Sequence, residues 1–574
     1  MRIVPKPQKM TISEEFVSAK SFRLEACCEK CGKIFSAFDC DGEVLVKLEQ
    51  VDYENSEKYE IKISGDGIFV KVAGHESAFR AVTTLKQIVA QSGEQLPLLE
   101  IEDEPSIKVR GYMLDISRGK IPSVEYVKQL CDLLADLKYN HLQLYMDSFV
   151  YEYKGFEEYW KDCQPLTEAE IKELVAYCKE RFIELVPIQN SFGHMAAWTA
   201  KEEIAPLAIT GKDGKPSQTL NPLLPETLEF LDRIYSGMMD AFDTDLFNIG
   251  MDETVDLGNE ETKEECDKKG VGRVYTEYLN KVCDLVTNKY KKTPMFFDDI
   301  VFKHPEELAN IPKNAVVMQW GYEGEQQFDR NCRLIKEHGL RFFVCPGTSM
   351  WGSITGRMNN AVINICTAAE CGNYYGAEGF LLTEWGDDGH PQFPANTYFP
   401  LVYGGYVSWN CGNHRSEPAY AERRAALYDC RAYLDKFVYK CEGEKSLADI
   451  VYRMGNFYLQ EDLLYFNGTE LNQCFMHREP RTPERLAGFE RVLKYMQGIR
   501  AELDGVKADA TMLREITLNC DMVIMLANLV LDRADKQECE RIFAEYRELW
   551  LQKNHEAGIN LFPDLVKGWL EPTV

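Results

Sequence analysis

The chain has 574 residues, of which 45% are hydrophobic and 27% charged, and its formal net charge is -27. This length predicts two to four domains with a large buried core, because single hydrophobic cores stop growing beyond about 250–300 residues. The negative charge repels nucleic acid phosphates and anionic lipids, and no basic cluster offsets it, so we expect no nucleic acid partner and no membrane partner. Neutral or cationic small substrates fit this charge better.

The first ten residues, MRIVPKPQKM, contain two prolines and no apolar run, so we expect no secretory signal. The longest apolar runs in the chain are also too short to cross a bilayer. These features favour a cytoplasmic location.

The 19 cysteines follow no regular spacing. We expect no disulfide framework and interpret most of them as small buried hydrophobic residues in a reducing compartment. Cys28 and Cys31 form a CxxC motif, with Cys27 and Cys40 nearby, which is half of what a zinc site needs. Because no second CxxC or paired histidine follows at a usual spacing, we interpret these cysteines as ordinary thiols and predict no metal and no other cofactor.

Residues 1–105 are predicted to form a small α+β domain. Apolar and polar residues alternate as in strands over 43–48 and 59–63, and Gly65-Asp66-Gly67 reads as a hairpin turn. Apolar residues then recur at helical spacing over 78–89. Asp103-Glu104-Pro105 interrupts the pattern and marks the boundary.

Residues 106–412 alternate between strands and helices, which predicts a (β/α)8 TIM barrel. One intervening helix opens with the capping box Thr167-x-x-Glu170. A barrel of this kind has its active site at the carboxyl ends of its strands. The eight predicted strands span residues 111–116, 141–146, 184–188, 246–249, 295–297, 315–318, 341–344 and 379–383.

Residues 413–574 are predicted to form a helical domain. Apolar residues trace one helix face over 486–503, and 512–530 reads as a more buried helix. We see no chemistry in these residues and expect the domain to pack on the barrel or on a partner subunit, so a homodimer is one prediction.

Carboxylates, tryptophans and basic residues stand next to several predicted strands. Tryptophan faces stack on the C–H face of a sugar ring, and carboxylates and arginine bind its hydroxyls. Each residue taken alone also has an ordinary structural explanation, but together at one end of a barrel they predict a pyranose site. The candidates are Arg110, His194, Asp252, Glu253, Trp320, Trp351, Trp385 and Asp387.

Four motifs resemble those of family 20 glycoside hydrolases, the β-N-acetylhexosaminidases. They are Arg110-Gly-Tyr-Met-Leu-Asp-Ile-Ser-Arg118, Gly193-His194, Ile249-Gly-x-Asp-Glu253 and Trp385-x-Asp387. The N-terminal region also resembles the α+β domain that precedes the barrel of this family, so the resemblance covers about residues 1–410. It implies an exo-acting enzyme that removes terminal N-acetylhexosamine sugars, either GlcNAc or GalNAc.

The resemblance implies a retaining, substrate-assisted mechanism in which the 2-acetamido oxygen of the sugar attacks its own anomeric carbon. Glu253 would be the general acid/base, and Asp252 would orient the acetamido N–H and stabilise the oxazolinium-like intermediate. Arg110 would bind hydroxyls on the far side of the ring, and Asp387 a hydroxyl near carbon 4 or 6. His194 would support the site, and Trp320 and Trp385 would wall the acetamido pocket.

The sequence departs from the family pattern at several positions. Asn248 and Met251 replace the usual His and Gly, and Phe297 stands where a Trp is common. Residues 345–351 lack the Tyr-x-Asp whose tyrosine binds the acetamido oxygen. Either Trp351 closes the pocket there, or another tyrosine supplies the hydroxyl, the candidates being Tyr322, Tyr374 and Tyr375. Such variants resemble an intracellular branch that includes hexosaminidase D.

Three other functions stay open at this stage. A conventional two-carboxylate glycosidase of another sugar specificity would use Asp298 or Asp387 as its nucleophile. A metal-dependent amidohydrolase would need paired histidines after an early strand, where this chain offers Asp115 and Arg118 but no His-x-His. A non-catalytic sugar-binding relative would not need to retain Glu253 beside Asp252.

Overall fold

A mixed six-stranded sheet with two helices forms the N-terminal region of the computed structural model, which describes residues 1–412 and 418–571. The strand order is β1-β6-β4-β5-β3-β2, and α2 packs on strands β4, β5 and β6. These elements confirm the predicted α+β fold. Their bounds are β1 (Lys9–Ser18), β2 (Phe22–Glu25), α1 (Glu29–Ile34), β3 (Val44–Gln50), β4 (Tyr59–Ser64), β5 (Gly67–Val72), α2 (His75–Ser92) and β6 (Gln95–Asp103).

Eight parallel strands close into a barrel in the order β12-β13-β14-β15-β16-β7-β8-β9. Every predicted strand overlaps an observed one, so the predicted fold class is confirmed. Apolar side chains such as Met113, Tyr145 and Met295 fill the barrel interior, which is a packed core and not a pore. The strands are β7 (Val109–Asp115), β8 (His141–Met146), β9 (Glu184–Gln189), β12 (Leu246–Asn248), β13 (Thr293–Phe297), β14 (Val316–Trp320), β15 (Arg341–Cys345) and β16 (Gly379–Glu384).

Helices surround the barrel strands, and their starts follow the expected capping chemistry. The Thr167 hydroxyl accepts a hydrogen bond from the Glu170 backbone N–H, and the Glu170 carboxylate accepts one from the Thr167 N–H at 2.8 Å. The elements of this layer are α3 (Val124–Asp136), α4 (Glu157–Trp160), α5 (Glu168–Glu180), α6 (Ala196–Thr199), β10 (Ala208–Thr210), β11 (Pro216–Leu220), α7 (Pro225–Met238), α8 (Glu260–Lys269), α9 (Val271–Asn288), α10 (Asp299–Lys303), α11 (Phe328–Glu337), α12 (Met358–Tyr375) and α13 (Tyr398–Trp409).

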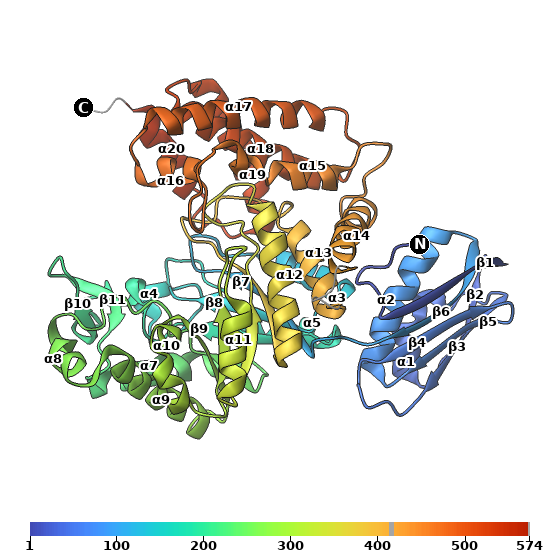
Figure 1. Ribbon diagram of the computed structural model, residues 1–574, viewed down its shortest axis with the longest axis horizontal. Coiled ribbons are helices and arrows are strands. Elements are labelled where there is room, and N and C mark those ends of the chain that lie inside the picture. Colours follow the sequence, from blue (N-terminus) through green and yellow to red (C-terminus); the bar gives the residue numbers. More distant parts are fainter. Residues whose placement is uncertain (413–417, 572–574) are drawn as a thin grey trace.

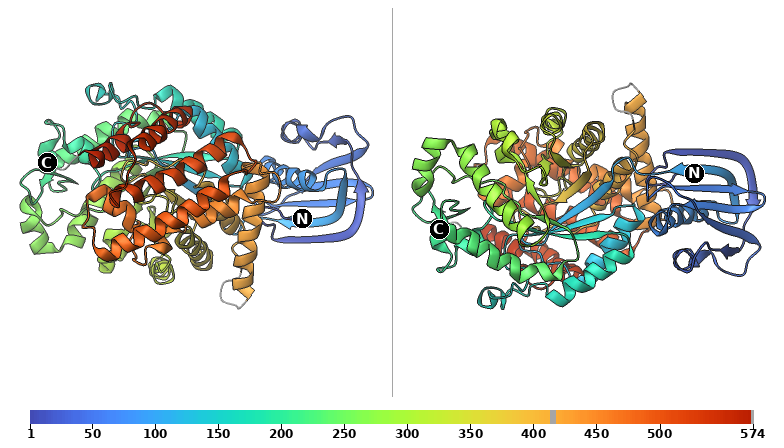
Figure 2. Two further views of the ribbon diagram at one scale, coloured as in Figure 1. Left: turned by 90° about the horizontal axis from the view of Figure 1, so that it is seen from above. Right: turned by 90° about the horizontal axis from the view of Figure 1, so that it is seen from below.

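The C-terminal region is helical and lies across one end of the barrel, with the N-terminal sheet beside the barrel (Figures 1 and 2). The Ser123 N–H donates to the Lys553 carbonyl at 2.8 Å, which ties α19 to the start of α3. The helices are α14 (Pro418–Tyr433), α15 (Leu447–Met454), α16 (Glu470–His477), α17 (Pro483–Leu503), α18 (Ala510–Val530), α19 (Lys536–Lys553) and α20 (Leu561–Leu570). The domain therefore packs on the barrel of its own chain.

The predicted boundary between residues 412 and 413 adjoins 413–417, which lie outside the described residues. The described residues contain no assigned disulfide. Within 1–412 and 418–571, none of the helices combines the length and the apolar character that a bilayer crossing requires.

Candidate active site

A cavity of about 310 Å³ opens at the carboxyl ends of the barrel strands. Its position is the one that a (β/α)8 fold predicts for an active site. Seven of the eight residues that the sequence suggested line this one cavity: His194, Asp252, Glu253, Trp320, Trp351, Trp385 and Asp387.

The chain turns sharply where β12 ends, and this turn separates two adjacent carboxylates. Gly250, Met251 and Glu253 have φ angles of 67°, 77° and 51°, in the left-handed region that residues other than glycine rarely adopt. Asp252 is consequently buried, whereas half of the Glu253 side chain is exposed. The two neighbours thus face different environments, one enclosed and one open to the cavity mouth.

His194 joins the two carboxylates. Its Nε2 lies 3.2 Å from Asp252 Oδ2 and 3.4 Å from Glu253 Oε2, and Asn190 Nδ2 donates to Asp252 Oδ1 at 2.8 Å. Burial by itself would lower the pKa of His194, but the charge of Asp252 and hydrogen bonds to both carboxylates raise it to about 10. Burial would likewise raise the pKa of Asp252, but the His194 charge and the bonds from His194 and Asn190 keep it below its usual value. The pair is therefore imidazolium and carboxylate at neutral pH.

Aromatic rings wall the cavity, and Tyr322 lies at their centre. Its ring stacks on Trp320 at a centroid distance of 5.0 Å and meets the edge of Trp351 at 4.9 Å. Its hydroxyl oxygen accepts a hydrogen bond from Trp385 Nε1 at 2.6 Å. The ring of Phe297 lies 5.8 Å from that of Trp385.

The structure distinguishes between the three tyrosines proposed for the missing acetamido contact. Tyr322 lines the cavity, whereas Tyr374 and Tyr375 lie at the C-terminal end of α12, outside the cavity lining. Tyr374 is 57% exposed, and the Tyr375 hydroxyl donates to Asp329. Tyr374 and Tyr375 are therefore wrong as candidates, and Trp351 and Tyr322 both belong to the wall.

Several buried polar atoms in the cavity lining have no protein partner. Protein interiors pair most such atoms, so a cluster of unpaired ones indicates hydrogen-bonding capacity kept for a ligand. Burial raises the pKa of Asp299 to about 7 and also raises that of Asp298. The unpaired atoms are Asp298 Oδ2, Asp299 Oδ1, Gln319 Oε1, Trp320 Nε1 and Asn331 Oδ1.

Arg118 is the basic residue of the cavity, and sequence reasoning missed it. Its Nη1 lies 2.8 Å from Asp115 Oδ2 and 3.6 Å from Asp387 Oδ1, and its guanidinium lies 5.2 Å from the centre of a Trp385 ring. Burial raises the pKa of Asp387 to about 6, although the Arg118 charge opposes the rise. The signal was available, since Arg118 follows the carboxyl end of β7 at Asp115.

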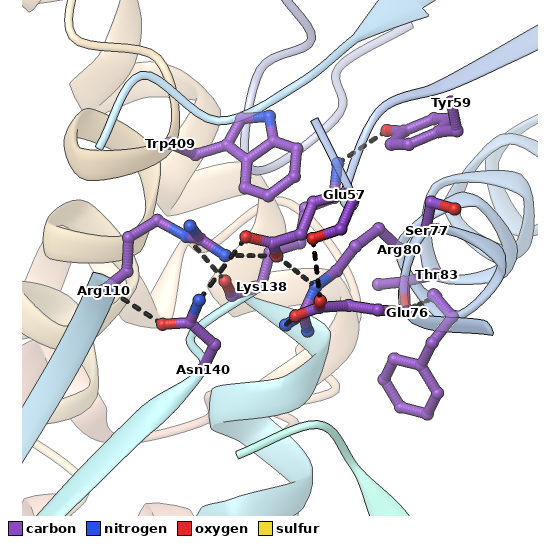
Figure 3. Close-up of polar contacts among 12 residues, drawn as sticks. Glu57, Tyr59, Glu76, Ser77, Arg80, Thr83, Arg110, Lys138, Asn140 and Trp409 are labelled. Atoms are coloured by element: carbon purple, nitrogen blue, oxygen red, sulfur yellow. Dashed lines mark hydrogen bonds and ion pairs between the residues drawn. The ribbon is translucent and has the colours of Figure 1, made fainter. Parts of the chain in front are cut away.

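Arg110 was wrong as a substrate-binding residue. It is the second residue of β7, at the opposite end of the barrel, and its side chain is 1% exposed. Its Nη2 donates to Glu57 Oε2 at 2.5 Å and its Nε to the Lys138 carbonyl at 2.9 Å, and its guanidinium stacks over Trp409 (Figure 3). Arg110 therefore joins the N-terminal domain to the barrel. A residue at the amino end of a barrel strand lies on the face that contributes to stability, and the active site lies on the opposite face.

The C-terminal region reaches the cavity through a loop, residues 462–469. Phe466 and Asn467 line the cavity, and the Phe466 side chain is 78% exposed at its mouth. Asn467 Oδ1 accepts a hydrogen bond from Trp351 Nε1 at 2.9 Å, and the Asn467 N–H donates to Glu323 at 2.7 Å. Sequence analysis named no site residue in the helical domain, and the structure places Phe466 and Asn467 beside the cavity. The loop reads Asp-Leu-Leu-Tyr-Phe-Asn-Gly-Thr, a short apolar run without the spacing of a helix or of a strand, so periodicity gave no signal.

The histidine and carboxylates of the cavity do not assemble as metal ligands. Among the described residues, the single group of three or more ligand atoms within 4.8 Å of one another consists of cysteines in the N-terminal domain.

Two family models match the chain. "Glycosyl hydrolase family 20, catalytic domain" matches residues 108–361, and "Glycosyl hydrolase family 20, domain 2" matches residues 23–104. Similar curated proteins include a β-hexosaminidase of Akkermansia muciniphila, 26% identical over 36% of this chain and 48% of that protein. Another is the β-hexosaminidase subunit beta of Entamoeba histolytica, 24% identical over 49% of this chain and 52% of that protein. The chain thus spans about half the length of the curated relatives it matches.

Solved structures share the fold. A chitobiase of Flavobacterium johnsoniae aligns over 99% of both chains with a TM-score of 0.62 and 16% identity. A β-N-acetylhexosaminidase of Bacteroides fragilis aligns over 78% of this chain and 98% of its own, with a TM-score of 0.60 and 17% identity. Because the two family models together cover more than half of the sequence and the described barrel and sheet correspond to them, the chain belongs to glycosyl hydrolase family 20.

Proposed function

We propose that this chain is an exo-acting β-N-acetylhexosaminidase that hydrolyses terminal GlcNAc or GalNAc residues with retention of configuration. The observation that carries the proposal is the pair Asp252 and Glu253, one enclosed and one open, at a cavity walled by three tryptophans. The similarity to proteins named β-hexosaminidase, and to a structure from Streptomyces plicatus in complex with GlcNAc, supports it.

The geometry suits a substrate-assisted reaction. The 2-acetamido oxygen attacks the anomeric carbon as the glycosidic C–O bond breaks, and the leaving oxygen takes the proton of Glu253. Glu253 then removes a proton from water, which opens the oxazolinium ring and restores the acetamide. Asp252, held ionised by His194, binds the acetamido N–H and stabilises the cyclic cation.

The walls supply the remaining contacts of this proposal. The Tyr322 hydroxyl accepts from Trp385 and also has a hydrogen bond with Thr383, and it would turn its proton to the acetamido oxygen when the sugar binds, the role of the tyrosine missing from residues 345–351. Trp320, Trp351 and Trp385 enclose the sugar.

Two further sets of residues would contact the two ends of the bound substrate. Arg118 and Asp387 lie together and bind ring hydroxyls, the role first expected of Arg110. Phe466, exposed at the mouth, contacts the group on the leaving side of the scissile bond.

A panel of aryl β-glycosides that differ only at carbons 2 and 4 tests this function. The N-acetyl sugars should be cleaved, and analogues with a 2-hydroxyl or a free 2-amine should react orders of magnitude more slowly, because they lack the attacking oxygen. A thiazoline that mimics the oxazolinium should inhibit far more tightly than substrate binds.

Other outcomes would point to the alternative functions. Efficient cleavage of plain glucosides, or a covalent adduct on Asp298 or Asp387, would identify a conventional two-carboxylate glycosidase. Sugar binding without turnover would identify a non-catalytic relative.

We also propose a cytoplasmic location, which the irregular spacing of the nineteen cysteines supports, because disulfide frameworks belong to oxidising compartments. A homodimer stays a prediction, which sedimentation of the purified chain would test.

A further inference from the structure

Three cysteine side chains meet at the surface of the N-terminal domain, outside the lining of the candidate active site. The sulfur atoms of Cys27, Cys28 and Cys31, here called the thiol cluster, all lie within 4.8 Å of one another. Cys28 caps α1 and its sulfur accepts the Cys31 N–H at 3.5 Å, while Cys31 is buried in the core of the domain. Thiolates bound to one tetrahedral zinc, at about 2.3 Å each, lie roughly 3.8 Å apart, so a contraction of about 1 Å or less would bring the thiol cluster to ligand spacing.

A fourth ligand comes from a distant part of the sequence. His75 is the first residue of α2, 44 positions after Cys31, and its Nε2 lies 3.6 Å from Cys28 Sγ. With zinc–nitrogen bonds of about 2.0–2.1 Å, neighbouring nitrogen and sulfur ligands are separated by roughly this distance. His75 has this spacing to Cys28 and lies outside the group of three sulfurs that are all within 4.8 Å of one another, so its exposed ring has to turn toward Cys27 and Cys31 when the metal binds. The sequence alone showed no histidine at a usual spacing, and only the packing of α1 against α2 brings it to the cysteines.

We propose that Cys27, Cys28, Cys31 and His75 form a structural zinc site. Binding releases the three thiol protons to solvent, the imidazole binds in its neutral form, and no oxidant or reductant is involved. Four protein ligands and no open position are the pattern of structural and not catalytic zinc. A Cys28–Cys31 disulfide would use two of the thiols and leave Cys27 and His75 without a function.

The location indicates what the metal would stabilise. Helix α1 has six residues and adjoins β2, a four-residue edge strand, and both are short elements at the edge of the domain. Zinc would tie α1 to the start of α2. The same helix carries Arg80, whose Nε donates to Glu57 at 2.9 Å within the interface that also holds Arg110. The site would therefore stabilise the N-terminal domain and its attachment to the barrel, independently of the proposed reaction.

Metal content of the full chain, purified under reducing conditions, is the first test. We expect one zinc per chain by mass spectrometry of the elements, and loss of that zinc in Cys28→Ser. Cys40→Ser is the matched control, because Cys40 is a nearby exposed thiol outside the thiol cluster, and it should keep its zinc. Chelation should lower the melting temperature of the wild type but not that of Cys28→Ser, while hydrolysis well below both melting temperatures stays unchanged.

Cobalt substitution tests the ligand set where a cysteine variant fails to fold. Cobalt in the wild-type chain should show the strong visible bands of a tetrahedral site with a thiolate charge-transfer band. His75→Ala replaces an exposed side chain, so it should fold and give a shifted spectrum. Wild-type protein without zinc and without these cobalt bands, an unchanged spectrum in His75→Ala, or a Cys28–Cys31 disulfide in the reduced preparation would each overturn the proposal.

Discussion

His194 Nε2 lies 3.2 Å from Asp252 Oδ2, and this contact fixes the charge of both groups. The carboxylate raises the pKa of the imidazole to about 10 and the imidazolium keeps the pKa of the carboxyl low, although burial acts in the opposite direction on each. Asp252 can thus be enclosed in the cavity and still carry the negative charge that a cyclic cation needs.

Replacing His194 with Gln should shift the pH dependence of the reaction. Without the imidazolium, burial dominates and the pKa of Asp252 rises, so the acidic limb of the kcat/KM profile should move to higher pH. Initial rates on an aryl N-acetylglucosaminide over a pH series measure this. His338→Gln, at the end of α11 and outside the cavity lining, is the control and should leave the limb in place. An unmoved limb in His194→Gln would show that Asp252 does not depend on the histidine.

The same contact should make stability depend on pH in a defined window. The folded pKa of His194 is about 10 against an ordinary 6.5, so its stabilisation is complete below pH 6.5 and is lost as pH rises to about 10. Asp252 has a lowered pKa, so its contribution is lost at acidic pH instead. Urea unfolding should therefore show that the advantage of wild type over His194→Gln shrinks from pH 6.5 to 10. A constant difference over that window would contradict the ion pair.

Glu253→Gln should lower kcat/KM by roughly 10²–10⁴-fold for substrates with poor leaving groups, the range for a lost general acid/base. The loss should shrink in the glycosylation step for activated aryl leaving groups, because these need no proton. A series of aryl N-acetylglucosaminides with leaving groups of different pKa measures the dependence. An equal loss across the series in that step would remove Glu253 from the role of proton donor.

Arg110 and Arg118 should give opposite phenotypes. Arg110→Met removes one of the two arginine partners of the buried Glu57, which keeps Arg80, so the free energy of unfolding should fall by about 1–3 kcal/mol while kcat/KM of the folded enzyme is retained. Arg118→Lys keeps the positive charge but loses the planar guanidinium, whose N–H groups would bind two sugar hydroxyls at once. We therefore expect kcat/KM to fall by about 10–100-fold, with little change in the free energy of unfolding. Urea unfolding and steady-state kinetics separate the two effects, and reversed phenotypes would restore Arg110 to the site.

The loop of the helical domain should influence substrate binding. Asn467 has a φ of 60°, a conformation that glycine adopts without strain, so Asn467→Gly preserves the backbone while it removes the side chain that accepts the Trp351 hydrogen bond. We expect a higher KM, because the Trp351 ring loses its restraint. Phe466→Ala should raise KM for disaccharides more than for small aryl glycosides, because its ring lies at the mouth. Leu551→Ala, exposed on α19 and outside the cavity lining, is the control.

The sequence by itself determined the order of the elements and the identity of the central chemical groups. Hydrophobic periodicity located all eight barrel strands, because a strand buried by helices on one side and by the barrel core on the other must be apolar along its length. The pair Asp252 and Glu253 could be identified because two adjacent carboxylates stand four and five positions after the end of such a strand, and every parallel strand of a barrel ends at the same face.

The tertiary structure alone decided which residues meet across long separations. It showed that Arg118, and not Arg110, lies at the cavity, because the two residues stand at opposite ends of β7 and the site lies at one of them. It brought Asn467 to Trp351 and His75 to Cys28, contacts between segments 116 and 47 residues apart. Local patterns carry no information on such pairs, because their approach depends on how whole helices and sheets pack and not on the residues that flank each one.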